Sequence, residues 1–178
     1  MTETELLQRI RQVSGLAEGS RLRRWLHRPV GYPVALLHRT LLYRRTGRAL
    51  PRRCRTCWGD RFEVRLPSGT DIYLTGGKTH DSELRLARYL VKTLRRGNSF
   101  LDVGAHYGYF SLLAARRFGG GGRVVALEAS PTTFATLASN VRPAGVEAWN
   151  LAAAETSGGG GSFSSFQIYT PNTIRSIR

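Results

Sequence analysis

Residues 99–151 alternate short apolar runs with helical stretches, and this alternation constrains the fold more than any other feature of the chain. The apolar runs are SFLDV at 99–103, RVVAL at 123–127, and 146–151. Residues 109–118 and 131–141 are predicted helices, and Ser130 before Pro131 is typical of a helix start. Apolar strands joined through helices form a parallel sheet that helices cover on both faces. The sequence therefore predicts an α/β domain with a parallel sheet of about three to four strands.

A β-hairpin is expected ahead of this region. Arg61–Leu66 alternates polar and apolar residues, as a half-buried strand does. The turn sequence Pro67–Thr70 follows, and Asp71–Leu74 resumes as a second strand.

One more helix and one more strand are predicted. The helix is Asp81–Arg96, with Asp81 or Thr79 as its cap and Gly97 at its end. Its expected buried face consists of Leu84, Leu86, Ala87, Leu90, Val91 and Leu94. Residues 162–169 predict a further strand, and the last residues of the chain predict no element.

Residues 1–57 form a predicted basic helical extension, ahead of a domain that covers residues 58–178. Leu6, Leu7, Ile10 and Val13 recur at helical spacing, and residues 34–42 form a second apolar stripe with basic residues on the other faces. A helix of this kind lies on a membrane surface or packs on its own domain. We favour packing and keep peripheral membrane contact as the alternative.

The chain is strongly basic. It has 27 Lys and Arg against 12 Asp and Glu, a formal net charge of +15, and its only lysines are Lys78 and Lys92. A basic surface attracts nucleic acid, anionic lipid or an acidic substrate. A solvated, arginine-rich surface is the simplest interpretation, and a role at a membrane surface is the next. Since no recognition module is visible, no specific nucleic-acid partner is expected.

The two cysteines indicate neither a metal site nor a disulfide framework. Cys54 and Cys57 are spaced C-x-x-C, but no second pair and no suitably spaced histidines accompany them. We therefore expect no metal and a reducing, cytoplasmic location. No secretory leader and no membrane-spanning run are predicted.

The turn after the first apolar strand has the composition of a ligand-binding loop. Gly104 and Gly108 are spaced G-x-x-x-G, and Asp102 precedes them. An acid at that place suits a cationic ammonium group better than a diphosphate. The next strand ends in Glu128, whose carboxylate would accept hydrogen bonds from both ribose hydroxyls. These two acids at successive strand ends favour S-adenosylmethionine as the ligand.

Three segments of the chain resemble the FkbM family of S-adenosylmethionine-dependent methyltransferases. They are DVGAHYGYFSLLAA, GGRVVALEASPTTFATLASNV and NLAAAETSGGGGSF, and the resemblance covers about residues 58–166. The family often has Asn where His106 stands and EPNP where this chain has EASP. The resemblance implies a class I Rossmann-like fold and methyl transfer to a hydroxyl oxygen of a saccharide or other small molecule.

The resemblance also implies a set of cofactor-binding residues. The residues carried over to the methionine end are Asp102, Gly104, Ala105, His106 and Gly108. Glu128 would hold the ribose, and Ser130 or the alanines Ala152 and Ala153 would lie near the adenine. Glu83 stands where proteins of this family often have an acid that faces the cofactor cleft. The catalytic base is left unassigned: it is His106, His80 or Glu83, or it lies in the part of the family pattern that this chain lacks.

The family pattern continues with a strand that carries a D-x-E-G-like segment, which this chain lacks. We therefore expect a C-terminally truncated or divergent member whose first strand is an exposed apolar edge, prone to self-association. The alternative is a catalytically inactive remnant that only binds a cofactor or a partner. A nucleic-acid amino-methyltransferase is disfavoured, because its N/D-P-P-Y/F motif is absent.

Overall fold

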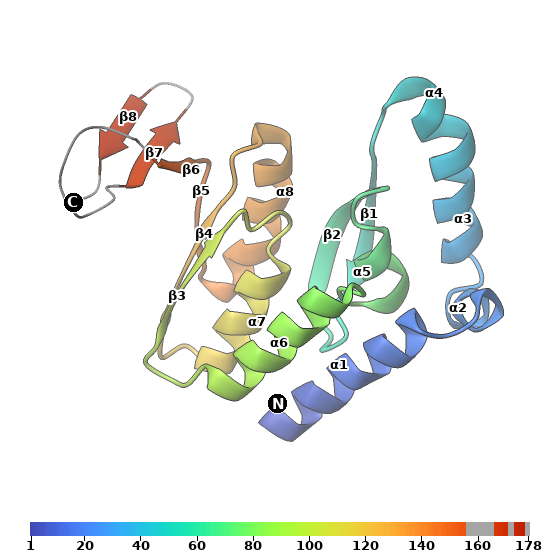
Figure 1. Ribbon diagram of the computed structural model, residues 1–178, viewed down its shortest axis with the longest axis horizontal. Coiled ribbons are helices and arrows are strands. Elements are labelled where there is room, and N and C mark those ends of the chain that lie inside the picture. The colour runs from blue at the N-terminus through green and yellow to red at the C-terminus, as the bar shows by residue number, and fades with distance from the viewer. Residues whose placement is uncertain (156–165, 171–172, 177–178) are drawn as a thin grey trace. The chain divides into compact units, whose positions relative to one another are not determined.

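A computed structural model describes residues 1–155, 166–170 and 173–176. The chain divides into two compact units, Met1–Leu94 and Arg95–Arg178 (Figure 1). The predicted domain boundary between residues 57 and 58 lies in the turn between two paired strands of the first unit, and that domain assignment stays a prediction. Among the described residues, no helix is both long enough and apolar enough to cross a bilayer.

The first unit begins with the predicted helices. They are α1 (Glu3–Ala17), α2 (Arg21–His27), α3 (Gly31–Leu37), the π-helical turn η1 (His38–Tyr43) and α4 (Arg44–Thr46). A capping box starts α1, where the Glu5 amide donates to Thr2 Oγ1 and the Thr2 amide donates to Glu5 Oε2. Of the predicted apolar face of α1, Leu6, Ile10 and Val13 are buried and Leu7 is half-buried.

The hairpin exists, but the predicted pairing of its strands is wrong. Strand β2 (Arg61–Leu66) pairs antiparallel with β1 (Leu50–Arg55), which lies in the segment predicted to be helical. Strand β1 lacks the alternating apolar pattern that would have predicted it. Residues 52, 53 and 55 are arginines, and Cys54 is the one buried residue of the strand.

The predicted second strand, 71–74, is instead part of helix α5 (Thr70–Thr75). Ile72, Tyr73 and Leu74 are consecutive and all buried, which a strand with one solvent-facing side does not allow. A short helix packed against both hairpin strands buries all three.

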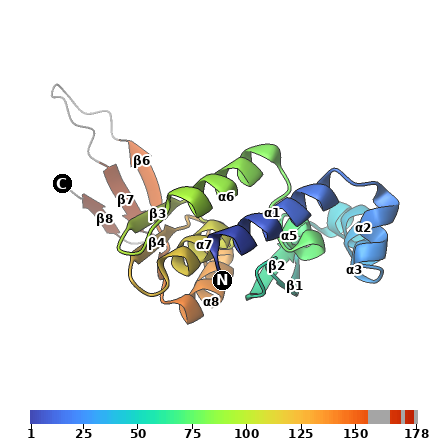
Figure 2. The same cartoon turned by 90° about the horizontal axis from the view of Figure 1, so that it is seen from below.

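Helix α6 (Asp81–Thr93) lies along α1 (Figure 1, Figure 2). Its buried residues are Leu84, Ala87, Leu90 and Val91, followed by Leu94, and the prediction was wrong for Leu86, which is 42% exposed. The helix ends earlier than predicted, because the Arg95 amide donates to the side chain of Asn98 at 2.8 Å rather than to a helix carbonyl. His80 occupies the N-cap position, so neither predicted cap residue does.

The second unit has the predicted parallel sheet. Its strands are β3 (Ser99–Val103), β4 (Arg123–Leu127) and β5 (Glu147–Trp149), in the order β3-β4-β5. Helices α7 (Tyr109–Phe118) and α8 (Pro131–Val141) connect them, and the short 3-10 turn η2 (Arg142–Ala144) follows α8. The predicted bounds of both helices and of the first two strands are confirmed; the third strand is shorter than predicted.

The described residues cover one face of this sheet, whereas the sequence predicted two covered faces. Helix α7 packs on β3 and β4 and α8 packs on β5, from the same side (Figure 1). On the opposite side Leu101 and Val103 of β3 and Trp149 of β5 are each more than half exposed. Strand β3 is also the edge of the sheet as described, so it is the exposed apolar edge that the sequence predicted.

The described end of the chain is an antiparallel sheet of three strands, β6 (Ala152–Glu155), β7 (Phe166–Thr170) and β8 (Thr173–Ser176). Strand β7 overlaps the predicted strand 162–169, whose residues 162–165 lie outside the described part of the chain. Strand β8 was not predicted, because its four residues alternate too briefly to be distinguished from a loop.

The open edge predicts self-association of the purified chain. An edge strand offers unpaired backbone groups, and lysine substitution is the usual way to block such pairing. We expect the wild-type chain to form dimers or larger species in sedimentation velocity, and Leu101→Lys with Val103→Lys to make it monomeric. Leu86→Lys, at an exposed apolar site on α6, is the control and should associate like wild type. A monomeric wild-type chain would contradict the prediction.

Candidate functional site

The predicted ligand-binding residues of the second unit gather at the carboxyl ends of β3 and β4. The loop 104–108 follows β3 and residues 128–130 follow β4. Because Val103 and Leu127 are register partners, these two loops start side by side. Ligands of open parallel sheets bind at this edge.

Glu128 joins the two loops through its carboxylate. Oε2 accepts a hydrogen bond from the His106 amide at 3.0 Å, and Oε1 accepts one from the Ser130 amide at 2.9 Å. A carboxylate has about four acceptor positions, so two remain for other donors. The half-buried side chain is thus fixed in place and still able to accept hydrogen bonds from a ligand.

The backbone of Glu128 is anchored to the neighbouring strand. Its amide donates to the Trp149 carbonyl, and its carbonyl accepts from the Leu151 amide at 3.1 Å and from the Asn150 side chain at 2.7 Å. Asn150 also donates to the carbonyl of Ala129 at 3.1 Å. Asn150 was not predicted as a site residue, although a polar residue at the end of an apolar strand is a usable signal.

The loop after β3 turns over the end of β4. The amides of Gly104 and Ala105 both donate to the Leu127 carbonyl at 2.9 Å. Among the described residues His106 is the one non-glycine with a positive φ, 55°. Asn, Asp and His are the non-glycine residues that tolerate this conformation best.

Gly108 is required by packing. A Cβ on Gly108 would lie 2.5 Å from Val141 Cγ1 and 2.7 Å from Leu137 Cδ1, both on α8. The Asn140 side chain, also on α8, donates to the Tyr107 carbonyl at 2.9 Å and holds the same loop. By contrast nothing lies within 4 Å of a Cβ built on Gly104, which is exposed. Of the two glycines, Gly104 is the one that leaves room for a ligand beside the backbone.

Asp102 turns its carboxylate toward α7. Its Oδ2 accepts a hydrogen bond from the fully buried Ser111 hydroxyl at 2.6 Å. Burial raises the pKa of Asp102, and hydrogen bonds from Ser111 oppose that rise. A positively charged ligand near Asp102 would stabilise the charged form that burial disfavours. Ser111 was not predicted, because its role depends on a residue nine positions away in the chain.

Ser130 follows the end of β4, and Ala152 follows the end of β5. Ser130 caps α8, with its Oγ accepting from the Thr133 amide at 3.4 Å. Ala152 is half-buried at the start of β6, directly after Leu151. Ala153 follows it in β6.

Glu83 belongs to the first unit, in the first turn of α6. Its Oε1 lies 3.0 Å from Lys78 Nζ, which is also 3.8 Å from Asp71 Oδ2. Burial raises the pKa of Asp71, and the Lys78 ammonium opposes that rise. His80 places Nδ1 2.9 Å from the Ser82 hydroxyl. The expected position of Glu83 at the cofactor stays a prediction.

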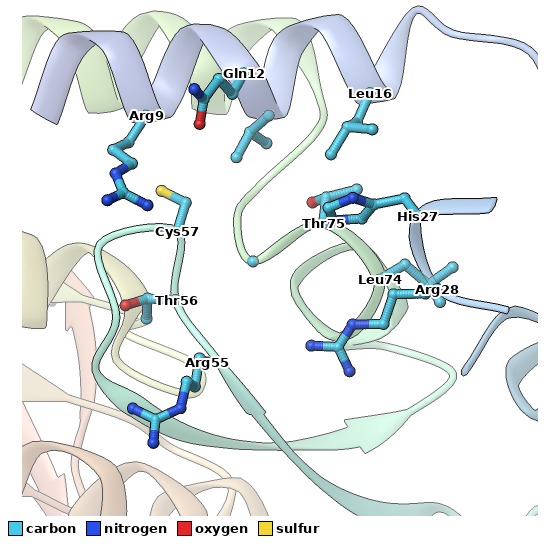
Figure 3. A pocket seen from close by; sticks show the side chains of 12 residues that line it. Arg9, Gln12, Leu16, His27, Arg28, Arg55, Thr56, Cys57, Leu74 and Thr75 are labelled. Atoms are coloured by element: carbon cyan, nitrogen blue, oxygen red, sulfur yellow. The ribbon is translucent and has the colours of Figure 1, made fainter. Parts of the chain in front are cut away.

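A pocket of about 270 Å³ also lies in the first unit (Figure 3). Residues of α1, α2, α5 and the β1–β2 turn line it, among them Arg9, Arg28, Arg55 and Cys57. None of the predicted cofactor residues lines this pocket. Cys54 is not part of it either, and burial raises the pKa of that thiol to about 11. Among the described residues no three His, Cys, Asp or Glu side chains are grouped as metal ligands would be.

Comparisons with known proteins give no family assignment. No protein-family model matches the chain, and no curated protein matches it. Among solved structures, the chain is similar to a Pyrococcus horikoshii protein described as "putative transferase PH0793", with 19% sequence identity and a TM-score of 0.40. The match covers 56% of this chain and 36% of the other, so the chain spans about a third of that protein.

The two glycines of the loop should respond differently to alanine. Gly108→Ala should lower the free energy of unfolding by about 3 kcal/mol, because a left-handed φ is combined with a clash against buried side chains of α8. Gly104→Ala adds the φ strain without a clash and should cost about 1 kcal/mol. Urea denaturation followed by circular dichroism measures both. Equal losses would contradict the packing role of Gly108.

Removing the charge of Asp102 should stabilise the fold near neutral pH. Above its raised pKa, the buried carboxylate is charged and its desolvation opposes folding, so Asp102→Asn should have a higher urea midpoint than wild type. As the pH falls through that raised pKa, the native wild-type chain takes up a proton more readily than the unfolded chain. Wild type then gains relative stability, and the difference between the two midpoints should narrow. A variant that is less stable at every pH would show that the Ser111 hydrogen bonds outweigh desolvation.

Proposed function

We propose that the second unit binds S-adenosylmethionine and that the chain is a methyltransferase of the kind its FkbM resemblance implies. The methyl acceptor would be a hydroxyl group of a small molecule or saccharide. The observation that carries the proposal is the Glu128 carboxylate, which is fixed by the amides of His106 and Ser130 at the sheet edge where ligands bind.

Glu128 has the properties that a ribose site needs. Two neighbouring hydroxyls donate to one carboxylate most strongly when its oxygens are already oriented and charged. The two backbone amides provide that orientation and leave acceptor positions free. Ser130 and Ala152, at the ends of the adjacent strands, would then border the adenine.

The residues after β3 suit the methionine end of the same ligand. Gly104 leaves open space beside the loop, so the backbone of the loop would approach the ligand closely. Asp102 supplies a half-buried carboxylate that, within the described part of the chain, is hydrogen-bonded by the neutral Ser111 hydroxyl. A ligand with an ammonium and a sulfonium group would provide a positive charge.

When bound, S-adenosylmethionine supplies a methyl group activated on a sulfonium sulfur. The protein then has to hold an acceptor hydroxyl in line with that methyl and receive the hydroxyl proton. His106, half-buried on the loop with its ring tilted against that of Tyr107 at a centroid distance of 3.7 Å, is the candidate base within the second unit. His80 and Glu83, the other candidates from the sequence, belong to the first unit. The base is left unassigned.

Isothermal titration of the full chain with S-adenosylmethionine tests the proposal. We expect binding by wild type and at least tenfold weaker binding by Glu128→Gln, because a hydrogen bond to a charged acceptor contributes about 1.5–3 kcal/mol. Far-ultraviolet circular dichroism establishes that the variant is folded. Absence of binding by a folded wild-type chain at millimolar ligand would overturn the proposal.

Glu147→Gln is the matched control. Glu147 is an exposed carboxylate on β5, bound to Arg123 at 2.8 and 2.9 Å, and the same substitution there removes one charge away from the loops. Its affinity for S-adenosylmethionine should equal that of wild type. Equal weakening in both variants would attribute the effect to net charge rather than to Glu128.

A second candidate function is binding without turnover. The exposed face formed by Leu101, Val103 and Trp149 supports it, because an apolar surface of this kind commonly binds another protein. A chain that binds S-adenosylmethionine but transfers no methyl group to saccharide or small-molecule hydroxyls would favour this candidate.

A further inference from the structure

The N-terminal helices of the first unit expose a row of large apolar side chains. On α2 these are Leu22, Trp25 and Leu26, and Val30 follows at the start of α3 with 76% of its surface exposed. Such side chains normally face the core of a soluble domain. Their concentration within one short segment marks it as an interaction surface.

The next helix exposes further large apolar side chains. Residues 31–46 form one helical segment, because the junctions at His38 and Arg44 keep right-handed helical dihedrals until Gly47 ends it in a left-handed conformation. Gly31, Ala35 and His38 of this segment are buried. Leu36, Leu37, Leu41 and Leu42 are all more than half exposed. In Figure 1 the segment runs from beside α2 to α4.

The π-helical turn brings these leucines together. In η1 the hydrogen bonds run from residue i to i+5, so residues five apart lie near each other on the helix surface. Leu36 and Leu41 are five apart, as are Leu37 and Leu42. The turn therefore gathers four leucines that a regular α-helix would spread over more of its circumference.

The charge around this surface is of one sign. Between Glu18 and Asp60 the chain has eleven arginines and not one acidic residue. On the helix itself Arg39, Arg44 and Arg45 are exposed beside the leucines. Exposed leucines with flanking arginines are complementary to a membrane interface, where the apolar groups enter the acyl region and the guanidinium groups meet phosphates.

Two other occupants fit less well. A nucleic acid would use the arginines but would leave the leucines in water. A second copy of this chain would place two acid-free, arginine-rich surfaces against each other, which like-charge repulsion opposes.

We propose that α2 and the helical segment 31–46 lie on the surface of a membrane that contains anionic lipid. The apolar side chains from Leu22 to Leu42 are buried at the boundary between headgroups and acyl chains, and the arginines bind the lipid phosphates. The attachment is peripheral and independent of the site at Glu128.

Vesicle co-sedimentation of the full chain tests this proposal. The vesicles are phosphatidylcholine alone, or phosphatidylcholine in which part is replaced by phosphatidylglycerol. Wild type should bind the anionic vesicles at least tenfold more tightly than the neutral ones. Leu36→Gln, Leu37→Gln, Leu41→Gln and Leu42→Gln combined should weaken binding to anionic vesicles about tenfold or more, since apolar burial contributes to interfacial affinity.

Two further variants make the result specific. Arg39→Gln, Arg44→Gln and Arg45→Gln combined should reduce the preference for anionic vesicles. Leu86→Gln with Tyr89→Gln, at exposed apolar positions on α6, is the matched control and should bind like wild type. Circular dichroism establishes that each variant is folded.

Three outcomes would overturn the proposal. The first is binding to anionic vesicles that the leucine variant does not weaken. The second is binding of wild type to duplex RNA with a steep salt dependence and none to vesicles, which would assign the surface to nucleic acid. The third is a dimer that the leucine variant abolishes, in a chain that does not bind vesicles.

Discussion

The candidate site depends on one carboxylate that holds two loops. Glu128 accepts hydrogen bonds from the amide of His106, 22 residues before it, and from the amide of Ser130, two residues after it. These contacts set the positions of the β3–α7 and β4–α8 loops at the sheet edge. The same side chain would be the ribose ligand, so the local fold and the proposed binding chemistry share one group.

Residues of α8 and residues after β5 hold the two loops that Glu128 joins. Gly108 allows α7 to approach α8, and Asn140 of α8 binds the carbonyl of Tyr107. Asn150 holds the backbone of Glu128 and Ala129 from the end of β5. Asp102 differs from these residues, because burial disfavours the charged form of its carboxylate. A group that opposes folding and would favour a cationic ligand is typical of a functional position.

Local signals predicted the second unit well and the hairpin poorly. The apolar runs of β3 and β4 and the Ser130 cap of α8 are signals that lie next to each other in the sequence. They therefore predicted the first and last residues of these elements correctly. Strand β1 was missed because its arginines carry no hydrophobic pattern, and α5 was misread because its buried residues depend on packing against the hairpin. Asn140 binds a residue 33 positions away, and Asn150 binds residues 22 and 21 positions away, so no local sequence pattern predicts these hydrogen bonds. Glu128 was predicted from its place after an apolar strand, but its hold on the two amides required the three-dimensional structure.

A crystal structure of the full chain with S-adenosylhomocysteine, the product form of the proposed cofactor, tests the central claim most directly. It should show both ribose hydroxyls within hydrogen-bond distance of the Glu128 carboxylate, with the amides of His106 and Ser130 still bound to the same oxygens. The ligand should pass beside Gly104 toward Asp102. A ligand bound in the pocket near Arg9 and Cys57, or one whose ribose does not contact Glu128, would contradict the account.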